Sequence, residues 1–569
     1  MVCFVQKEEI HKGWSGDKKY CVTDAQGNKF LLRVSPKDQR ERKRQEFERM
    51  QVVAKLGIPM CFPLEFGETA EEVYSVQTWI DGVDVEEVIA SYSETEQYAY
   101  GWEAGEILRK IHAIPAPEGQ EDWESWFNRK MDYKVKSYRE CPLSYENGDA
   151  FLQYIENNRH LLKNRPQSYQ HGDYHVGNMM LDRTGKLHIV DFNRDSYGDP
   201  WEEFNRIVWC AQASPLFATG MVDGYFLGEV PEIFWRLMTL YISSNTLGSL
   251  TWCLSYGEEE IAKMKNQAAQ VLDWYDGMTR IVPKWYQKNF TVQCLDGVPV
   301  KLRSAFDVCF VQKYGTVFQV YDDQDSGNLC FGVEKNGERF FVKFAGAPTV
   351  RYSGEPTEAI ERLKASEPIY RELAHPNLIE WVDSEEIGGG FAMVFRWSEG
   401  ECFGRMYPAS RAKFLATDLE TRKKIFFEIL DFLEHVAKRG YVAIDFYDGS
   451  ILYDFQAGKT VICDIDFFRK MPCVNDMGRM WGSATFMSPE EMTLGAVLDE
   501  VTNVYTAGAM AFALFADRSR ERTDWPLSDA SFSVVSQAVT ADRGHRPQSI
   551  RQLRELWEVA VGSEDRNRK

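Results

Sequence analysis

The chain has 569 residues, of which 44% are hydrophobic and 27% are charged, and its formal net charge at pH 7 is −20. This length exceeds what one hydrophobic core normally fills, so two or more domains are expected. The acidic balance argues against a nucleic-acid-binding protein.

The sequence predicts a cytoplasmic protein without membrane contacts. Its first residues lack the basic segment and long apolar core of a signal peptide. One uncharged stretch of membrane length, residues 237–257, is rich in serine and threonine, so we expect a buried helical region there. Twelve cysteines without a C-x-x-C pair favour reduced thiols over a disulfide framework or a zinc ribbon.

The first predicted elements are a turn, a strand hairpin and a helix. Residues 12–20 can form a Gly/Ser turn whose backbone N–H groups and Ser15 hydroxyl would approach a phosphate. The alternating segment 29–34 follows a Gln-Gly-Asn turn, as the second strand of a hairpin would. The helix that carries Glu46 begins in a charged run, residues 40–44, which indicates a solvated helix face.

Carboxylate and amide side chains of catalytic type follow in a closely spaced group. Residues 171–178 run His-Gly-Asp-Tyr-His-Val-Gly-Asn, and a hydrophobic strand then ends at Asp191. Phosphoryl transfer needs one carboxylate to receive the acceptor hydroxyl's proton, and further oxygen ligands that hold Mg²⁺ against the phosphates. Asp173 is the candidate base, and Asn178 and Asp191 are the candidate metal ligands.

The two histidines of this loop allow another interpretation. His171 and His175 lie four residues apart, as a helical metal pair or two turn-capping residues would. Zinc is disfavoured because no third nitrogen or sulfur ligand recurs nearby, and hard oxygen ligands favour Mg²⁺. His171 is therefore expected to orient the loop.

Together these elements resemble the aminoglycoside phosphotransferase family, also called the choline/macrolide-kinase-like family. The HGD-x4-N loop, the Val-Asp-Phe strand end and a Gly-Asp-Pro at residues 198–200 are all present, and the similarity runs through about residues 1–290. The resemblance implies ATP and Mg²⁺ as cofactors and a small-molecule hydroxyl as the phosphate acceptor.

The resemblance also implies roles for residues of the first strands. Arg33 stands where the family usually has a phosphate-anchoring Lys, and it stays charged and can bind two phosphate oxygens. Glu46 is its expected ion-pair partner. Residues 76–82 resemble the hinge that grips adenine through backbone groups, with Thr78 and Ile80 as the candidate contacts.

The acceptor is expected between the catalytic loop and a helical region, residues 205–285. In the family, the residue corresponding to Asp199 stabilises the loop around the active site. Aromatic side chains at this density fill a core more often than they line a pocket. The aromatic residues concerned are Trp209, Trp235, Tyr241, Trp252, Trp274 and Tyr275.

The second half of the chain repeats the spacing of the catalytic residues. Asp173 and Asp445 are 272 positions apart, and Asp191 and Asp464 are 273 positions apart. Such agreement indicates an internal repeat, which determines the architecture.

This half resembles the eukaryotic-type Ser/Thr protein kinases from about residue 310 to 560. Lys343 ends a strand that follows an Asn-Gly hairpin turn. Ser-Pro-Glu at residues 488–490 resembles the family's APE element, and Arg546 its usual partner. The resemblance implies Lys343 and Asp464 as nucleotide and metal ligands and Asp445 as the catalytic base.

Departures from that family are also evident. The metal-binding Asn is replaced by Ser450, a neutral and shorter ligand that weakens one metal site. No glycine loop is recognisable, and the corresponding hairpin, residues 321–328, carries three carboxylates that would repel phosphates unless they point away.

Two further contacts of the second half follow from the same resemblance. The helix Glu that pairs with Lys343 is either Glu367, which is closer in register, or Glu361. Residues 395–398 stand in the place of the hinge, with Trp397 as the candidate nucleotide contact.

We therefore expect an α+β chain of two tandem bilobal protein-kinase-like domains, each an antiparallel sheet lobe on a helical lobe, at residues 1–290 and 300–569. The first is expected to be an ATP- and Mg²⁺-dependent phosphotransferase acting on an alcohol group. The second is either a Ser/Thr protein kinase with a protein substrate or a nucleotide-binding regulator. The alternative is a nucleotide-sensing scaffold in which neither domain is an enzyme.

Overall fold

The computed structural model describes residues 4–11, 16–288 and 290–567. The chain divides into two compact units, Met1–Val292 and Gln293–Lys569. Within the described residues, no helix is both long and apolar enough to cross a membrane.

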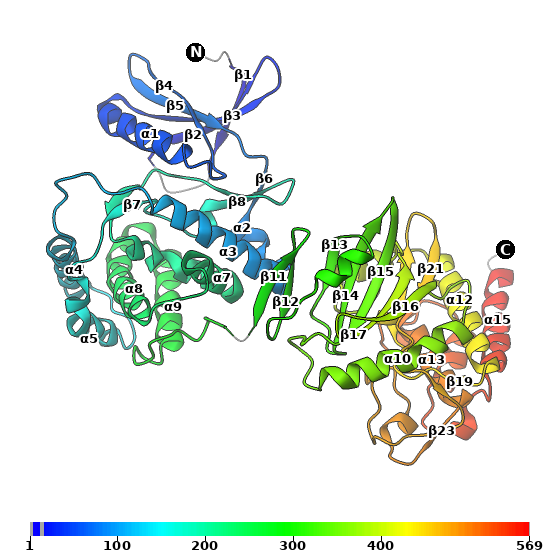
Figure 1. Cartoon of the computed structure of the whole chain (residues 1–569). Helices are drawn as coiled ribbons and strands as arrows, with labels where there is room; N and C mark the ends of the chain where they lie inside the picture. The colour runs from blue at the N-terminus through cyan, green and yellow to red at the C-terminus, as the bar shows by residue number, and fades with distance from the viewer. Residues whose placement is uncertain (1–3, 12–15, 289, 568–569) are drawn as a thin grey trace. The chain divides into compact units, whose positions relative to one another are not determined.

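The first unit begins with a strand lobe, a five-stranded antiparallel sheet in the order β1-β2-β3-β5-β4 with α1 packed beside it (Figure 1). Its elements are β1 (Phe4–Ile10), β2 (Lys18–Asp24), β3 (Lys29–Pro36), α1 (Arg40–Ala54), β4 (Pro63–Glu68) and β5 (Glu72–Thr78). The predicted turn joins β2 to β3: the Asp24 carboxylate accepts from the backbone N–H groups of Gln26 and Asn28, and Gly27 has a φ of 87°. This turn therefore fixes which residues of β2 and β3 pair, beginning with Thr23 and Lys29.

A small three-stranded sheet, β6-β8-β9, lies between the strand lobe and the helices of the first unit (Figure 1). Its strands are β6 (Gly82–Asp84), β8 (Met179–Asp182) and β9 (Leu187–Ile189), and a separate pair joins β7 (Ser168–Gln170) to β10 (Ser196–Gly198). The loops between these strands hold the candidate catalytic residues.

The helices of the first unit enclose a large apolar core. They are α2 (Val85–Val88), α3 (Glu94–Ile111), α4 (Trp123–Glu140), α5 (Asp149–Asn158), α6 (Ile207–Ala213), α7 (Pro215–Phe226), α8 (Glu232–Cys253) and α9 (Glu258–Trp274). Helices α3 and α7 approach closely through glycines: a Cβ on Gly101 would lie 2.0 Å from the carbonyl oxygen of Phe217. Most of α8 is buried, which confirms the buried helix expected over the uncharged stretch.

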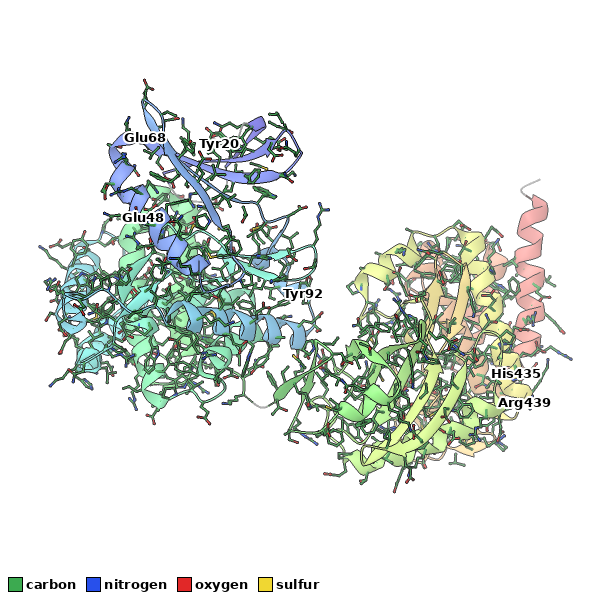
Figure 2. All side chains as sticks on the ribbon, turned by 45° about the horizontal axis from the view of Figure 1, so that its top comes forward. Tyr20, Glu48, Glu68, Tyr92, His435 and Arg439 are labelled. Atoms are coloured by element: carbon green, nitrogen blue, oxygen red, sulfur yellow. The ribbon has the colours of Figure 1, made fainter. Side chains whose placement is uncertain are left out.

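Side chains of both lobes are visible in Figure 2, with Tyr20 on β2 and Glu48 on α1 in the strand lobe. In the adjoining lobe, the ring of Tyr92 meets that of Tyr100 edge-on at a centroid distance of 5.3 Å (Figure 2). Edge-to-face contact is a favoured arrangement of aromatic rings.

The second unit repeats the order of the first: its five-stranded antiparallel sheet runs β13-β14-β15-β17-β16 and is followed by a three-stranded sheet, β18-β20-β21. The strands are β13 (Thr316–Tyr321), β14 (Asn328–Lys335), β15 (Glu338–Ala345), β16 (Trp381–Ile387), β17 (Gly390–Arg396), β18 (Glu401–Cys402), β20 (Ile451–Asp454) and β21 (Lys459–Ile462). Asn336 and Gly337 form the β14–β15 turn with φ angles of 55° and 79°, as an Asn-Gly hairpin requires.

Helix α10 (Pro356–Glu372) stands between β15 and β16, as α1 stands between β3 and β4. The other helices of the second unit are α11 (Pro408–Leu415), α12 (Leu419–Lys438), α13 (Glu500–Ala516), α14 (Asp529–Ala538) and α15 (Ile550–Asn567). The short strands β19 (Tyr441–Val442) with β22 (Arg469–Lys470), and β23 (Cys473–Val474) with β24 (Val497–Leu498), form two further pairs. His435 and Arg439 lie one turn apart at the end of α12 (Figure 2).

A hairpin of β11 (Thr291–Leu295) and β12 (Val298–Leu302) precedes the five-stranded sheet of the second unit, with Asp296 and Gly297 at its turn. Leu295 and Leu302 are buried in the apolar cluster of the second sheet. The Asp296 carboxylate accepts from the backbone N–H of Val317, so the hairpin is fastened to β13.

Candidate active site

The catalytic loop of the first unit is held in place by His171. Its Nε2 lies 3.0 Å from the carbonyl oxygen of Val190, and its Nδ1 accepts the backbone N–H of Asp173 at 3.3 Å. These partners assign the proton to Nε2. The fully buried ring thus joins the catalytic loop to the strand end that carries Asp191, as expected for an orienting residue.

Glu203, which sequence reasoning did not single out, holds the same loop from the other side. Its buried carboxylate accepts the backbone N–H groups of Gly172 at 3.2 Å and Tyr174 at 3.3 Å, on either side of Asp173. Gly172 has a φ of 82°, and a Cβ there would fall 1.9 Å from the carbonyl oxygen of Arg194, so only glycine fits.

The Asp173 carboxylate lies beside two guanidinium groups and the ring of His175, whose pKa burial lowers to about 4. Its oxygens lie 3.2 Å from Arg206 Nε, 3.4 Å from an Arg194 guanidinium nitrogen and 3.6 Å from His175 Nε2. The side chain is 16% exposed, which leaves it open to a substrate. Asn178 donates its amide N–H to the carbonyl oxygen of Asp173 at 2.9 Å, and so keeps its Oδ1 as a metal ligand.

Asp191 follows β9 in a left-handed conformation with a φ of 66°. Its carboxylate lies 2.6 Å from Arg33 and 3.6 Å from Lys19. Burial alone would raise the pKa of Asp191, but Arg33 and then Lys19 lower it to about 2. The group is therefore ionised at neutral pH, as a Mg²⁺ ligand must be.

The prediction that Glu46 pairs with Arg33 is wrong. Arg33 pairs instead with Asp17 at 2.9 Å as well as with Asp191. Glu46 lies 2.9 Å from Lys43, and Lys43 lies 3.0 Å from Asp17. The reason is the hairpin register, which pairs residue 18 with residue 34 and so brings the nearby Asp17 to Arg33 before α1 can supply a carboxylate.

Ser15 lies outside the described residues. Sequence reasoning missed Asp17 and did not assign Lys19 to Asp191, although the turn before β3 contained the signal. Counting back across the hairpin from that turn places Asp17 beside Ser35, whose hydroxyl donates to it at 2.6 Å.

Arg33→Ala is expected to raise the KM for ATP and lower turnover about 10- to 100-fold, because it removes one of the cations facing the metal-ligand Asp191. It should also destabilise the fold by about 1.5–3 kcal/mol, since the buried Asp17 would lose one partner but keep Lys43 and Ser35. Arg33→Lys should retain substantial activity because it keeps the charge. Steady-state kinetics and thermal unfolding measure both effects.

Arg42→Ala is the matched control, because Arg42 is 67% exposed and its ion pair is with Glu46, 2.9 Å away. An Arg33→Ala protein with the parent KM for ATP would mean that Lys19 anchors the phosphates instead.

A cavity of about 1120 Å³ brings the predicted residues of the first unit together. Six of them line it: Arg33, Thr78, Ile80, Asp173, Asn178 and Asp191. Helices α4, α8 and α9 form another part of its wall. Glu46 is not among the lining residues. The cavity is large enough for a nucleotide and a small acceptor together.

Only some of the aromatic residues expected near the acceptor reach this cavity. Trp209 and Trp252 line it, whereas Trp235, Tyr241 and Tyr275 are buried in the core. Tyr241 donates its hydroxyl to Asp199 at 2.6 Å, and Arg165 binds the same carboxylate through two nitrogens at 2.6 and 3.0 Å. The backbone carbonyl of Asp199 accepts from Gln170 on β7, so this residue steadies the strand before the catalytic loop.

In the second unit, the prediction that Lys343 pairs with Glu367, or with Glu361 as the alternative, is wrong. Lys343 lies 2.7 Å from Asp464 and 2.6 Å from Asp466, while Glu367 pairs with Arg371 at 2.6 Å. The reason is that residue 466 supplies a buried carboxylate next to Asp464. Helix α10 contributes Tyr370 there, whose hydroxyl donates to Asp466 at 2.9 Å.

The Asp445 carboxylate is buried near another carboxylate, whereas the Asp173 carboxylate lies beside two arginines. Burial raises the pKa of Asp445 to about 8, and the nearby charge of Asp464 adds to the shift. A Cβ on Gly482 would lie 3.0 Å from its Oδ1, so the chain passes close over the carboxylate. Ser450 stands where Asn178 stands in the first unit, and its buried hydroxyl makes no hydrogen bond within the described residues.

Lys301 on β12 partly neutralises the acidic hairpin of residues 321–328. Asp322 accepts the backbone N–H of Lys301 at 2.6 Å, and the buried Lys301 ammonium lies 3.1 Å from Asp323. Trp397 contacts the sheet: its backbone N–H donates to the carbonyl of Arg339 at 3.1 Å, so that donor is already used and does not fit an adenine contact.

Comparisons with known proteins were made for the whole chain. No curated protein matched it. Solved structures similar to it include the amicoumacin kinase hAmiN in complex with AMP-PNP, Ca²⁺ and Ami, at 14% identity, with 48% of this chain and 90% of that chain covered and a TM-score of 0.36. Another is a choline/ethanolamine kinase family protein from Mesorhizobium loti, at 15% identity, with 48% and 91% covered and a TM-score of 0.37. Likeness at this level identifies no acceptor. Residues 8–234 match the family model described as the phosphotransferase enzyme family.

Proposed function

We propose that the first unit transfers the γ-phosphoryl group of ATP to a hydroxyl group of a small molecule. The observation that carries this proposal is the meeting of Asp173, Asn178, Asp191 and Arg33 around one cavity. Asp173 accepts the hydroxyl proton, and Arg33 with Lys19 holds the phosphates. Asn178 and Asp191 provide the oxygen ligands for Mg²⁺, which offsets phosphate charge when bound.

The test is a transfer assay of the full chain with labelled ATP, with and without Mg²⁺, against a panel of hydroxyl compounds. Transfer that depends on Mg²⁺ is expected for at least one class of acceptor. A chain that neither binds nor hydrolyses ATP at millimolar concentration would contradict the proposal and favour a scaffold.

For the second unit we propose a protein-kinase-like domain that binds nucleotide and turns over slowly, in a regulatory role. Three observations support it: the repeated sheet order, the Lys343–Asp464 ion pair, and the buried pair of Glu490 and Arg546 at 2.7 Å, which matches the expected partners. The Ser450 and Asp445 environments favour slow turnover over an active Ser/Thr protein kinase.

In a full chain whose first unit is inactivated by Asp173→Asn and Asp191→Ala, we expect ATP to bind at two sites, of which Lys343→Ala removes one. Self-phosphorylation at Ser483 or Thr485 should be weak. Ser450 weakens the clamp on the transferring phosphate, so rate suffers more than binding. A fluorescent ATP analogue and labelled ATP measure the two.

Lys335→Ala is the control, because this lysine is exposed and its ammonium donates to the backbone carbonyl oxygen of Lys313 at 3.0 Å. Rapid, Asp445-dependent phosphorylation of protein substrates would overturn the slow-turnover proposal. If the second unit binds no ATP at millimolar concentration, the proposal of a nucleotide site there is wrong.

A further inference from the structure

Five cations line the part of the cavity around and beyond Asp173, and we call them the cationic wall. They are Lys130 and Lys134 on α4, Arg194 after β9, Arg206 at the start of α6, and Lys263 on α9. Glu260 on α9 and Glu86 on α2 are carboxylates of the same lining. Two members of the cationic wall, Arg194 and Arg206, share the single carboxylate of Asp173.

Some of these cations are already engaged. Lys130 lies 3.2 Å from Glu202 and over the ring of Trp126 at 4.9 Å. Lys263 lies over the ring of Trp209, at 4.9 Å from its centroid. These contacts offset part of their charge and fix their positions.

Lys134 differs from these cations, because its ammonium is an unused donor. Within the described part of the chain, the Lys134 ammonium makes no hydrogen bond and has no carboxylate oxygen within 4.0 Å. Arg206 lies beside it in the same lining, with its buried Nε 3.2 Å from Asp173 in an ion pair that lacks hydrogen-bond geometry. An unpaired cationic donor in a half-buried position costs stability unless a ligand satisfies it.

Packing against a neighbouring helix fixes the position of the Lys134 side chain. Its stem packs against α8 at Gly248, where a Cβ would lie 3.1 Å from its Cδ and Cε atoms. A larger residue at that place would displace the stem. Lys130, one turn earlier on α4, adds a like charge beside it, which an isolated helix would disfavour. Burial, and then Lys130, lower the pKa of Lys134 to about 7, so about half of these side chains are protonated at neutral pH and a bound anion favours the charged form.

Resting on the proposed function, we propose that the phosphate acceptor is a hydroxyl compound with an anionic group, a carboxylate or a phosphate, which Lys134 and Arg206 bind while its hydroxyl faces Asp173. In the transfer, the bond between the γ-phosphorus and the β–γ bridging oxygen of ATP breaks, and the acceptor oxygen forms a bond to that phosphorus. The hydroxyl proton passes to Asp173, and ADP leaves with the bridging electron pair. A polycationic acceptor would meet repulsion from the cationic wall.

Binding tests the acceptor class separately from transfer. With the nucleotide site of the full chain filled by Mg²⁺ and ADP, calorimetry compares glucose with glucuronate and glucose 6-phosphate, and adds kanamycin as a cationic probe. At least one anionic sugar is expected to bind 10-fold or more tightly than glucose, and kanamycin less tightly than either anion. The ratio between glucuronate and the phosphate ester distinguishes the two anionic groups.

Lys134→Met removes the charge but keeps the length of the side chain, and it should abolish this preference for an anion. Lys136→Met is the matched control on the same helix, because Lys136 is 72% exposed and points to Glu140. Equal binding of glucose and both anions, or tighter binding of kanamycin, would overturn the acceptor class. So would an unchanged anion preference in Lys134→Met.

The proposed function fails on a different result, namely no ATP binding or hydrolysis by the parent chain. If the parent chain hydrolyses ATP but shows no preference for an anion, the acceptor class alone is overturned. Gly248→Ala provides a second variant, which displaces the Lys134 stem without removing its charge and should weaken anion binding several-fold.

Discussion

Asp173→Asn is expected to lower phosphoryl transfer by about 10²- to 10⁴-fold, the usual contribution of a positioned general base. Asn has nearly the same shape and stays between Arg194 and Arg206, but it cannot accept the hydroxyl proton. ATP binding should remain, because the phosphate and metal contacts come from Arg33, Asn178 and Asp191. Single-turnover transfer and calorimetric ATP affinity measure the two properties.

Asp132→Asn is the control for the first substitution, since Asp132 is 66% exposed on α4 and its ion pair is with Arg159. Transfer at the parent rate by the Asp173→Asn chain would mean that another group takes the proton. Equal losses of transfer and of ATP affinity would point to a disturbed loop instead.

Asp191→Ala is expected to lower transfer by at least about 10²-fold and to raise the Mg²⁺ concentration needed for half-maximal activity. The substitution removes a charged oxygen ligand and also frees Arg33 and Lys19, which now lie at 2.6 and 3.6 Å from it. Affinity for ATP without Mg²⁺ should therefore not fall. Titrations of ATP with and without Mg²⁺ separate the two effects.

Asp191→Asn keeps a neutral oxygen ligand and should show an intermediate Mg²⁺ requirement. Asp182→Asn is the control, because Asp182 ends β8 and its carboxylate bonds within its own turn to Thr184 and His188. An unchanged Mg²⁺ requirement in Asp191→Ala would contradict the assignment of Asp191 as a metal ligand.

The catalytic loops were predictable from sequence because their geometry is local. The Asp-x4-Asn spacing places Asn178 within one short loop of Asp173, and the strand end at Asp191 follows from a hydrophobic run. Hairpin turns at Gly27 and at Asn336-Gly337 were predictable for the same reason, since backbone conformation there depends on the residue itself.

Partners across elements were not predictable in the same way. Arg33 pairs with Asp17 and not Glu46, and Lys343 with Asp466 and not Glu367, because an ion pair depends on distances between elements to within about an ångström. The sequence by itself indicated the candidate catalytic residues and the repeated order of strands in the two units. Only the tertiary structure decided which charges meet, and it placed Lys134 and Arg206 beside Asp173 although helix α4 and the start of α6 lie far apart in the chain.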